Sequence, residues 1–370
     1  MKKVAIITYD INWIFAGGAK SGGASVVNKN LILEFAKNPE VDLTILCLEG
    51  AFKPIDGVKI VPVPYTNSYE GFLQNIENEV EKGNFDVVLT VSLEYMNRNP
   101  ILQSQSFRHR CEVEPFPINL IKKFSSRKKI KKQDKMFEKL RSDNKYIAVS
   151  QSIKKDYVNN YKLNPDNVYV CHLGCNEIYE TMPEIKKNEF ITFGCVANNS
   201  INKGGHLFLL GLFALNLIGC NKFKAKIISK NKILKMISTI LGLGKKVEFL
   251  PPQENIVNYY KSLDCLVLPS KNEAFGLVVL EEMSCGKPCV VSSFAGVAEI
   301  ISDNENGLIF DRNCFFSFVL NLRKMYKMFK TEEYDKMSLK AFETSKNYTW
   351  KNFAESILNC FLTLILILIF

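Results

Sequence analysis

The sequence lacks the residue pairs that mark common metal and disulfide sites. It contains no Asp-x-Asp pair in its 370 residues, and its eleven cysteines include no Cys-x-x-Cys pair. An odd and unpatterned set of cysteines makes a poor disulfide or zinc framework. The cysteines therefore predict buried thiols in a reducing cytosol, and the sequence predicts no metal site.

The sequence also lacks the features that would carry it into or across a membrane. The apolar stretch after Met1 is short and no small-residue cleavage pattern follows it, so it predicts a strand and not a signal peptide. The apolar run 357–370 has 14 residues, whereas a helix needs about 17 to 25 to cross a bilayer. A buried or interfacial end, or a chain cut short, explains this run better than a transmembrane helix. We expect a cytoplasmic protein.

The composition is that of a globular protein, with 47% hydrophobic and 23% charged residues. A chain of 370 residues is too long for one ordinary core and suits two domains of about 150 to 200 residues each. No internal repeat or low-complexity tract interrupts it.

The net charge of +10 is concentrated in residues 122–145, which hold eleven Lys and Arg against three Asp and Glu. Apolar side chains alternate with these cations, a pattern consistent with an amphipathic helix that lies on an anionic membrane. A solvated helix face is the alternative. No nucleic-acid recognition motif accompanies the charge, so nucleic acid is not an expected partner.

Short apolar runs alternate with helical stretches along both halves of the chain. This alternation predicts an α/β protein with two doubly wound parallel sheets. We expect one domain over 1–178, a second over 179–345, and a final helix over 346–370. The expected strands are 4–9, 41–48, 58–63, 85–92, 146–150, 190–196, 225–229, 247–250 and 265–268.

Two carboxylates flank the start of a helix after the apolar run Cys265–Leu268. Glu273 lies in the loop that follows this run, and Glu281 lies inside the helix that opens near Gly276. The carboxyl edge of a parallel sheet is where such folds bind ligands. The two carboxylates should lie roughly 9 to 12 Å apart, so they can bind the two ends of one elongated ligand.

The first helical turn between these carboxylates suits an anion. The backbone N–H groups of Phe275, Gly276 and Leu277 would point at a phosphate or a sugar hydroxyl. Glycine at 276 lets the backbone approach the ligand closely. The adjacent Glu282 is expected on the solvated face of the helix.

The order strand, Glu-x-Phe-Gly, Glu281 and Gly286-Lys-Pro resembles the donor site of retaining glycosyltransferases of family 4. The resemblance implies the GT-B fold, in which two Rossmann-like domains face a cleft. It implies transfer of a sugar from a nucleotide-diphosphate sugar to an acceptor hydroxyl, an EC 2.4 reaction without cofactor or metal. It further implies polysaccharide biosynthesis, such as lipopolysaccharide or capsule, on a glycan or glycolipid acceptor at the inner face of the cell membrane.

The resemblance also assigns roles to single residues. It implies that Glu281 accepts hydrogen bonds from the ribose hydroxyls and that Glu273 holds hydroxyls of the transferred sugar. Lys203, in Asn202-Lys-Gly-Gly205, would neutralise the diphosphate. The arginine that family members carry five residues before this lysine is replaced by Asn198. A neutral hydrogen bond from Asn198, or charge from Arg108 or Lys230, would have to replace it.

The amino-terminal half contributes two further candidate sites by resemblance. Gly22 and Gly23 lie in a glycine-rich turn before a helix, where they would let the backbone approach the donor phosphate or the acceptor. His109 follows a candidate strand, where family members often place a histidine near the sugar, and a solvated surface role is its alternative.

The motif argues against one other function and leaves others open. A glycosidase needs two carboxylates that face one glycosidic bond, which this motif does not supply. A GT-B nucleotide-sugar epimerase or phosphorylase would share the same donor site. The absent arginine also permits a catalytically lapsed paralogue that binds a nucleotide sugar or a partner protein.

Overall fold

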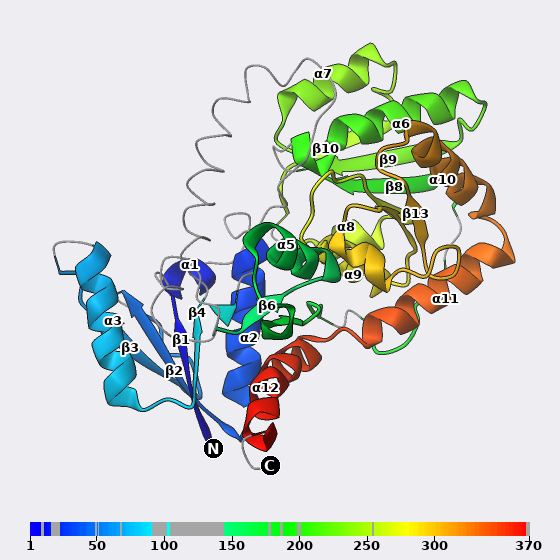
Figure 1. Cartoon of the computed structure of the whole chain (residues 1–370). Helices are drawn as coiled ribbons and strands as arrows, with labels where there is room; N and C mark the ends of the chain where they lie inside the picture. Colours follow the sequence, from blue (N-terminus) through cyan, green and yellow to red (C-terminus); the bar gives the residue numbers. More distant parts are fainter. Residues whose placement is uncertain are drawn as a thin grey trace. The chain divides into compact units, whose positions relative to one another are not determined.

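The structure is a computed structural model that describes residues 1–8, 11–15, 23–48, 50, 52–66, 69–90, 102–103, 144–176, 179–185, 188–197, 201–253 and 255–367. The chain divides into two compact units. One comprises Met1–His172 together with Phe353–Phe370, and the other comprises Leu173–Asn352. Figure 1 shows the elements of each unit.

The first unit is built on a parallel four-stranded sheet of order β3-β2-β1-β4. Apolar side chains on both faces of these strands explain the sheet, because helices must then cover both faces. Figure 1 shows α3 on one face and α2 on the other. The elements are β1 (Lys2–Ile7), α1 (Ile11–Phe15), α2 (Gly23–Lys37), β2 (Val41–Leu48), β3 (Val58–Val63), α3 (Tyr69–Gly83) and β4 (Val87–Thr90).

A second, three-stranded sheet closes this unit, and helix α12 (Trp350–Ile367) enters the unit at Phe353. The sheet has the order β5-β6-β7. Ser150 caps α5 by accepting a hydrogen bond from the backbone N–H of Ile153. The elements are β5 (Leu102–Gln103), β6 (Tyr146–Ala148), α5 (Gln151–Tyr161), the 3₁₀ turn Pro165–Asn167 and β7 (Val168–Val170).

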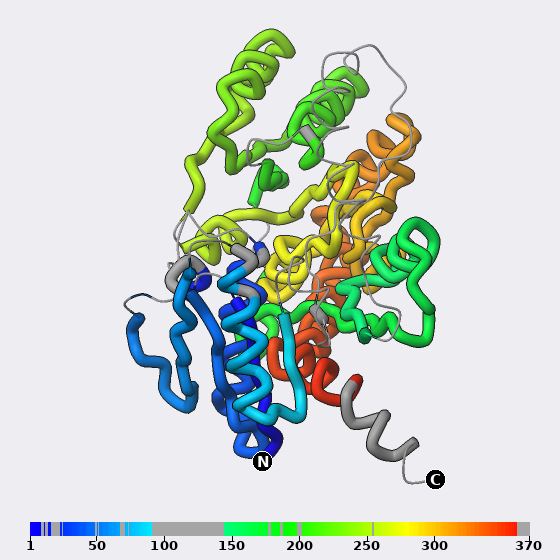
Figure 2. The backbone as a smooth tube through the Cα atoms, turned by 60° about the vertical axis from the view of Figure 1, so that its left-hand side comes forward, coloured from blue at the N-terminus to red at the C-terminus, as the bar shows by residue number. Residues whose placement is uncertain are grey.

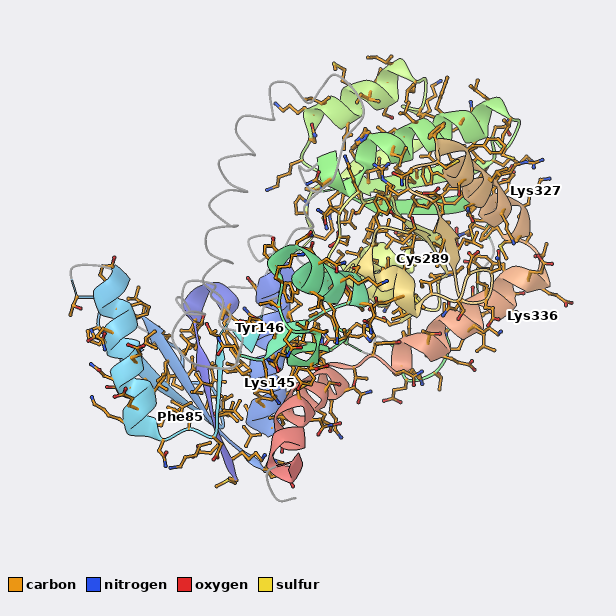
Figure 3. All side chains as sticks on the ribbon, in the orientation of Figure 1. Phe85, Lys145, Tyr146, Cys289, Lys327 and Lys336 are labelled. Atoms are coloured by element: carbon orange, nitrogen blue, oxygen red, sulfur yellow. The ribbon has the colours of Figure 1, made fainter. Side chains whose placement is uncertain are left out.

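Lys145 departs from the expectation for the basic segment 122–145. It is buried, and its Nζ donates to the backbone oxygen of Cys360 in α12 at 2.6 Å. Burial lowers the pKa of Lys145. Figure 3 shows it at the start of β6. Lys145 therefore holds α12 in place and is not part of a lipid-facing surface, and residues 122–143 lie outside the described part of the chain.

The second unit is built on a parallel six-stranded sheet of order β10-β9-β8-β11-β12-β13. Its strands are β8 (Ile191–Val196), β9 (Phe223–Ile228), β10 (Val247–Leu250), β11 (Cys265–Leu268), β12 (Cys289–Ser292) and β13 (Leu308–Phe310). Its α-helices are α6 (Gly205–Leu217), α7 (Lys232–Ile240), α8 (Val257–Lys261), α9 (Leu277–Met283), α10 (Phe315–Met328) and α11 (Glu332–Lys346).

One large core lies under the helices on one face of this sheet. It joins strand residues such as Phe193 and Val267 to Phe208 of α6, Phe318 of α10 and Tyr334 of α11. Helix α6 lies between α7 and α10 in Figures 1 and 2. A continuous core of this size fixes the sheet and so fixes the loops at its edge.

The order of these strands places the site. The chain runs outward from β8 through β9 to β10, and then returns so that β11 pairs with the other side of β8. The loops that follow β8 and β11 therefore start next to each other at one edge of the sheet. From there the chain continues toward opposite ends of the strand order. Such a switch point is where open parallel sheets bind ligands.

The fold agrees with the sequence expectations in its main features. Both predicted parallel sheets are present, which confirms the predicted fold class. Four strands have the predicted bounds, namely 41–48, 58–63, 247–250 and 265–268. No helix in the described ranges is both long and apolar enough to cross a membrane.

Candidate functional site

The candidate site lies in the second unit, at the carboxyl edge of β8 and β11. The backbone N–H of Lys271, after β11, donates to the backbone oxygen of Asn202, after β8, at 2.8 Å. This hydrogen bond ties the two loops together at the switch point. The site is thus built on two loops that a rigid sheet holds in register.

Gly204 allows the two loops to lie this close. It has φ +69°, and a Cβ built on it would lie 2.1 Å from the backbone oxygen of Pro269. Any other residue would combine left-handed strain with a collision against backbone. In the Lys-Gly-Gly sequence, Gly204 is therefore needed for the close packing of the two loops. This requirement is separate from the role at the diphosphate that the resemblance suggests for Lys203.

Lys203 and Glu273 form an ion pair across these loops through Nζ and Oε2. The Lys203 side chain is 37% exposed and the Glu273 side chain 16% exposed. The hydroxyl of Ser270 lies 3.5 Å from the same carboxylate oxygen. The two residues that the sequence assigns to different parts of one ligand thus touch each other directly.

The loop that carries Glu273 is also held by the loop after β12. The backbone oxygen of Glu273 accepts from the N–H of Gly296 at 3.0 Å, and that of Phe275 accepts from Val297 at 2.7 Å. Gly276 caps α9 with φ +117°, and a Cβ on it would lie 2.9 Å from Leu268. Three neighbouring strand ends therefore fix the start of α9, which begins at Leu277, one residue after the predicted start near Gly276.

Glu281 lies on α9 and is partly buried. The hydroxyl of Tyr260, on α8, donates to its Oε2 at 2.5 Å. Burial raises the pKa of Glu281 to about 7, and the hydrogen bond from Tyr260 opposes this rise. The carboxyl group can therefore change its charge near neutral pH. No sequence pattern identified Tyr260, because a tyrosine before a buried strand is common in any core.

The expectation for Glu282 was wrong. Glu282 is fully buried, and neither of its carboxylate oxygens has a hydrogen-bond partner within the described residues. Burial raises its pKa well above the ordinary value, and the charge of Lys287 opposes this effect. The nearby Lys287 lies 3.9 Å from Asp264. Neighbouring positions on a helix differ by about 100°. With Glu281 directed at Tyr260, Glu282 therefore lies on a different, buried side of α9.

The predicted site residues divide into three groups. Gly22, His109 and Asn198 lie outside the described residues. Gly23 begins α2 in the first unit and is exposed. Lys203, Phe275, Gly276, Leu277, Glu273 and Glu281 lie together in the second unit. In the portions of the chain that are described, no three His, Cys, Asp or Glu side chains form a group that could hold a metal ion.

The sequence over residues 185–343 matches the family Glycosyl transferases group 1. The D-inositol 3-phosphate glycosyltransferase of Rhodococcus jostii (strain RHA1) is 26% identical over 127 residues. That match covers 34% of this chain and 28% of the relative, so it spans less than a third of the relative's length. The family match over residues 185–343 includes Lys203, Glu273 and Glu281.

The second unit is therefore similar to the group 1 glycosyltransferases. Two solved structures show that the chain has the GT-B fold. WaaG, a glycosyltransferase involved in lipopolysaccharide biosynthesis, has a TM-score of 0.69 at 15% identity over 96% of this chain and 98% of its own. The Anabaena protein HepE in complex with UDP-glucose has a TM-score of 0.69 at 17% identity over 97% and 99%. At such identities the likeness shows the fold alone.

Proposed function

We propose that this chain is a group 1 glycosyltransferase that transfers a sugar from a nucleotide-diphosphate sugar to an acceptor hydroxyl with retention of configuration. The observation that carries the proposal is the Lys203–Glu273 pair at the switch point, with Glu281 on the helix that follows. A cation and two carboxylates in this order match the three parts of such a donor: diphosphate, sugar and ribose.

Lys203 stabilises the departing diphosphate. Breaking the bond between sugar and phosphate leaves its electron pair on the diphosphate, which gains one negative charge, and a fixed cation beside that charge lowers the barrier. In the structure its charge is matched by Glu273. A donor diphosphate would draw Nζ away from Glu273, and the freed carboxylate would accept hydrogen bonds from the sugar hydroxyls. Donor binding thus exchanges the Lys203–Glu273 ion pair for a Lys203–diphosphate pair, and hydrogen bonds from the sugar hydroxyls replace the lysine at Glu273.

Glu281 selects the ribose. A carboxylate can accept two donors at once, and the two ribose hydroxyls supply them. Tyr260 holds one oxygen of the carboxyl group from the side of α8, so its orientation is fixed before the ligand arrives. Hydroxyl donors favour the ionised form of Glu281, which binding would stabilise against the effect of burial.

The remaining predicted residues complete the proposal. The turn at Phe275, Gly276 and Leu277 offers backbone donors to the phosphate or sugar. Four further residues act on the donor or acceptor, and substitution of each would test this: Gly22, Gly23, Asn198 and His109. The donor class is supported by the UDP-glucose bound in HepE. A lipid-linked surface glycan as acceptor is supported by the role of WaaG in lipopolysaccharide biosynthesis.

A second candidate is a lapsed paralogue that binds a nucleotide sugar without turning it over. The observation that favours it is Asn198 in place of the family's arginine, because a missing guanidinium removes one bidentate phosphate contact.

One experiment separates the two functions. A thermal-shift panel of nucleotide sugars first identifies the donor, since ligand at 100 times its Kd stabilises by about 2.7 kcal/mol. Release of nucleoside diphosphate from that donor is then measured. Slow release that Glu273→Gln abolishes supports transfer, whereas binding without any release supports the lapsed paralogue. No shift with any nucleotide sugar would contradict both.

A further inference from the structure

The outer face of α7 is unusual for a helix of a water-soluble unit. Ile233, Met236 and Ile240 recur at helical spacing along one side and are 60%, 56% and 74% exposed. The opposite side carries the buried Leu234 and Ser238. The helix thus lies flat on its unit with one apolar stripe against the core and a second stripe facing outward.

The charges around this stripe have one sign. Residues 190–247 contain nine lysines and no Asp or Glu. Lys230, Lys232, Lys235 and Lys245, next to or on α7, are all exposed. None of these four forms an ion pair with any residue that the structure describes. The apolar stripe is therefore bordered by cations that have no acidic neighbour.

Helix α6, which lies beside α7, and helix α10, on the other side of α6, add exposed apolar side chains. Helix α6 packs between α7 and α10 (Figure 2), and each exposes large apolar side chains. Residues 312–331, which include α10, contain five cations and no acid. Lys327 of α10 points away from the sheet in Figure 3. The exposed apolar residues of α6 and α10 are Leu210, Leu217, Phe315, Phe316 and Leu320.

We propose that the helical face formed by α7, α6 and α10 binds the surface of an anionic membrane, with the α7 stripe inserted among the lipids. An exposed apolar stripe bordered by lysines is the pattern of a helix that lies in the membrane interface. Each cation near an anionic leaflet adds attraction, and apolar side chains of this size rarely form a patch on a free surface. A protein partner would need an acidic, apolar surface of matching extent, whereas an anionic lipid layer supplies both features everywhere.

This surface belongs to the second unit and contains no residue of segment 122–145. It does not depend on glycosyl transfer, so the two proposals can fail independently. If both hold, the site in the second unit works close to a lipid-linked acceptor because the same unit binds the membrane.

The test is vesicle co-sedimentation of the full chain without donor. Vesicles of phosphatidylcholine alone are compared with vesicles that also contain phosphatidylglycerol. The test variant is Met236→Glu with Ile240→Glu. The control is Leu339→Glu on α11, which is 44% exposed and lies on a helix that begins with acidic residues. Circular dichroism and thermal melting establish that each variant folds.

We expect the wild type to bind the anionic vesicles and to be released by high salt. The α7 variant should bind them about tenfold more weakly or worse, while the control binds like the wild type. The comparison is repeated with Arg127, Lys128, Lys129, Lys131 and Lys132 all changed to Gln, so that the basic segment does not hide the effect.

Three outcomes would overturn the proposal. In the first, the α7 variant binds anionic vesicles as well as the wild type does in both backgrounds. In the second, the wild type binds neutral vesicles equally well. In the third, the wild type self-associates in the absence of lipid and the α7 variant abolishes only that association, which would assign the face to a second copy of the chain.

Discussion

Lys203 and Glu273 form an ion pair that joins the loop after β8 to the loop after β11. The pair spans the switch point of the second sheet, where a nucleotide-sugar donor is proposed to bind. The positive charge needed for the diphosphate is therefore already present, but a carboxylate shares it. This relationship makes the two residues partners in donor binding instead of independent contacts.

The first prediction concerns this pair. Lys203→Ala should weaken a nucleoside diphosphate and its sugar ester alike, by about 1.5 to 3 kcal/mol for a lost charged hydrogen bond. Glu273→Gln should bind the plain nucleoside diphosphate at least as tightly as wild type, because Lys203 no longer has a competing anion. Titration calorimetry measures both. Weaker nucleotide binding by Glu273→Gln would contradict the exchange of partners.

The second prediction is a pH dependence that belongs to Glu281. Its pKa is raised to about 7 by burial, and only the ionised form accepts two ribose hydroxyls. Donor affinity should therefore fall as the pH drops below about 7. The intact nucleotide sugar must be used, because its diphosphate does not titrate in this range. Glu281→Gln should bind weakly and show no such dependence.

Tyr260→Phe provides the matched variant for this prediction. The hydrogen bond from Tyr260 lowers the pKa of Glu281, so its removal should move the midpoint of the affinity curve to higher pH. The Kd at high pH should change less than the midpoint does. A pH profile that is the same in wild type and Glu281→Gln would mean that another group titrates.

The third prediction concerns the stability effect of Glu282. Its pKa is raised in the folded protein, so the folded state holds this proton to higher pH than the unfolded state does. The free energy of unfolding should therefore fall as pH rises above the ordinary glutamate pKa, by up to about 1.4 kcal/mol per pH unit. Glu282→Gln should remove this slope. Compared with wild type, the variant should therefore gain more stability at pH 8 than at pH 5.

Glu305→Gln is the control for this measurement. Glu305 is exposed and pairs with Lys340 at 3.0 Å, and surface pairs contribute little to stability. Denaturant unfolding of wild type and both variants at pH 5 to 8 isolates the buried carboxyl. Parallel curves for wild type and Glu282→Gln would show that Glu282 stays ionised in the fold.

The fourth prediction tests the close approach of the two loops. Gly204→Ala and Gly219→Ala place the same side chain at left-handed positions, with φ +69° and +82°. Both should lose about 1 to 2 kcal/mol of stability from backbone strain. A Cβ on Gly219 has no atom within 4 Å, whereas that on Gly204 meets Pro269. Only Gly204→Ala should also weaken donor binding. An equal loss of donor affinity in the two variants would contradict the role of the loop contact.

The sequence predicted the elements whose patterns are local. The run Cys265–Leu268 is apolar on both faces and bounded by Pro269, which is enough to set a buried strand, and Gly276 marks the start of the helix after it. The strand β13 and the helices α5, α7, α10 and α11 were among the elements that were not predicted. The sequence of α7 is amphipathic, but its apolar stripe Ile233, Met236 and Ile240 faces outward, which the sequence alone does not indicate.

Partners across the fold were beyond the reach of local patterns. Periodicity could not decide which of Glu281 and Glu282 faces the core, since neighbouring helix positions differ by about 100° and the helix is only two turns long. The contacts of Glu281 with Tyr260 and of Lys203 with Glu273 depend on the sheet order, which no local pattern specifies. The charges of the site could be listed from sequence, but their pairing could not.

The most direct test of the account is calorimetric titration of a nucleoside diphosphate and its sugar ester into wild type, Glu281→Ala and Glu273→Ala. Glu281 is proposed to bind ribose, which both ligands contain, so Glu281→Ala should weaken both to the same extent. Glu273 is proposed to touch only the sugar, so Glu273→Ala should leave the plain nucleotide's affinity nearly intact while transfer falls, mainly in kcat. Equal loss of nucleotide affinity in both variants, or no change in either, would contradict the donor site proposed here.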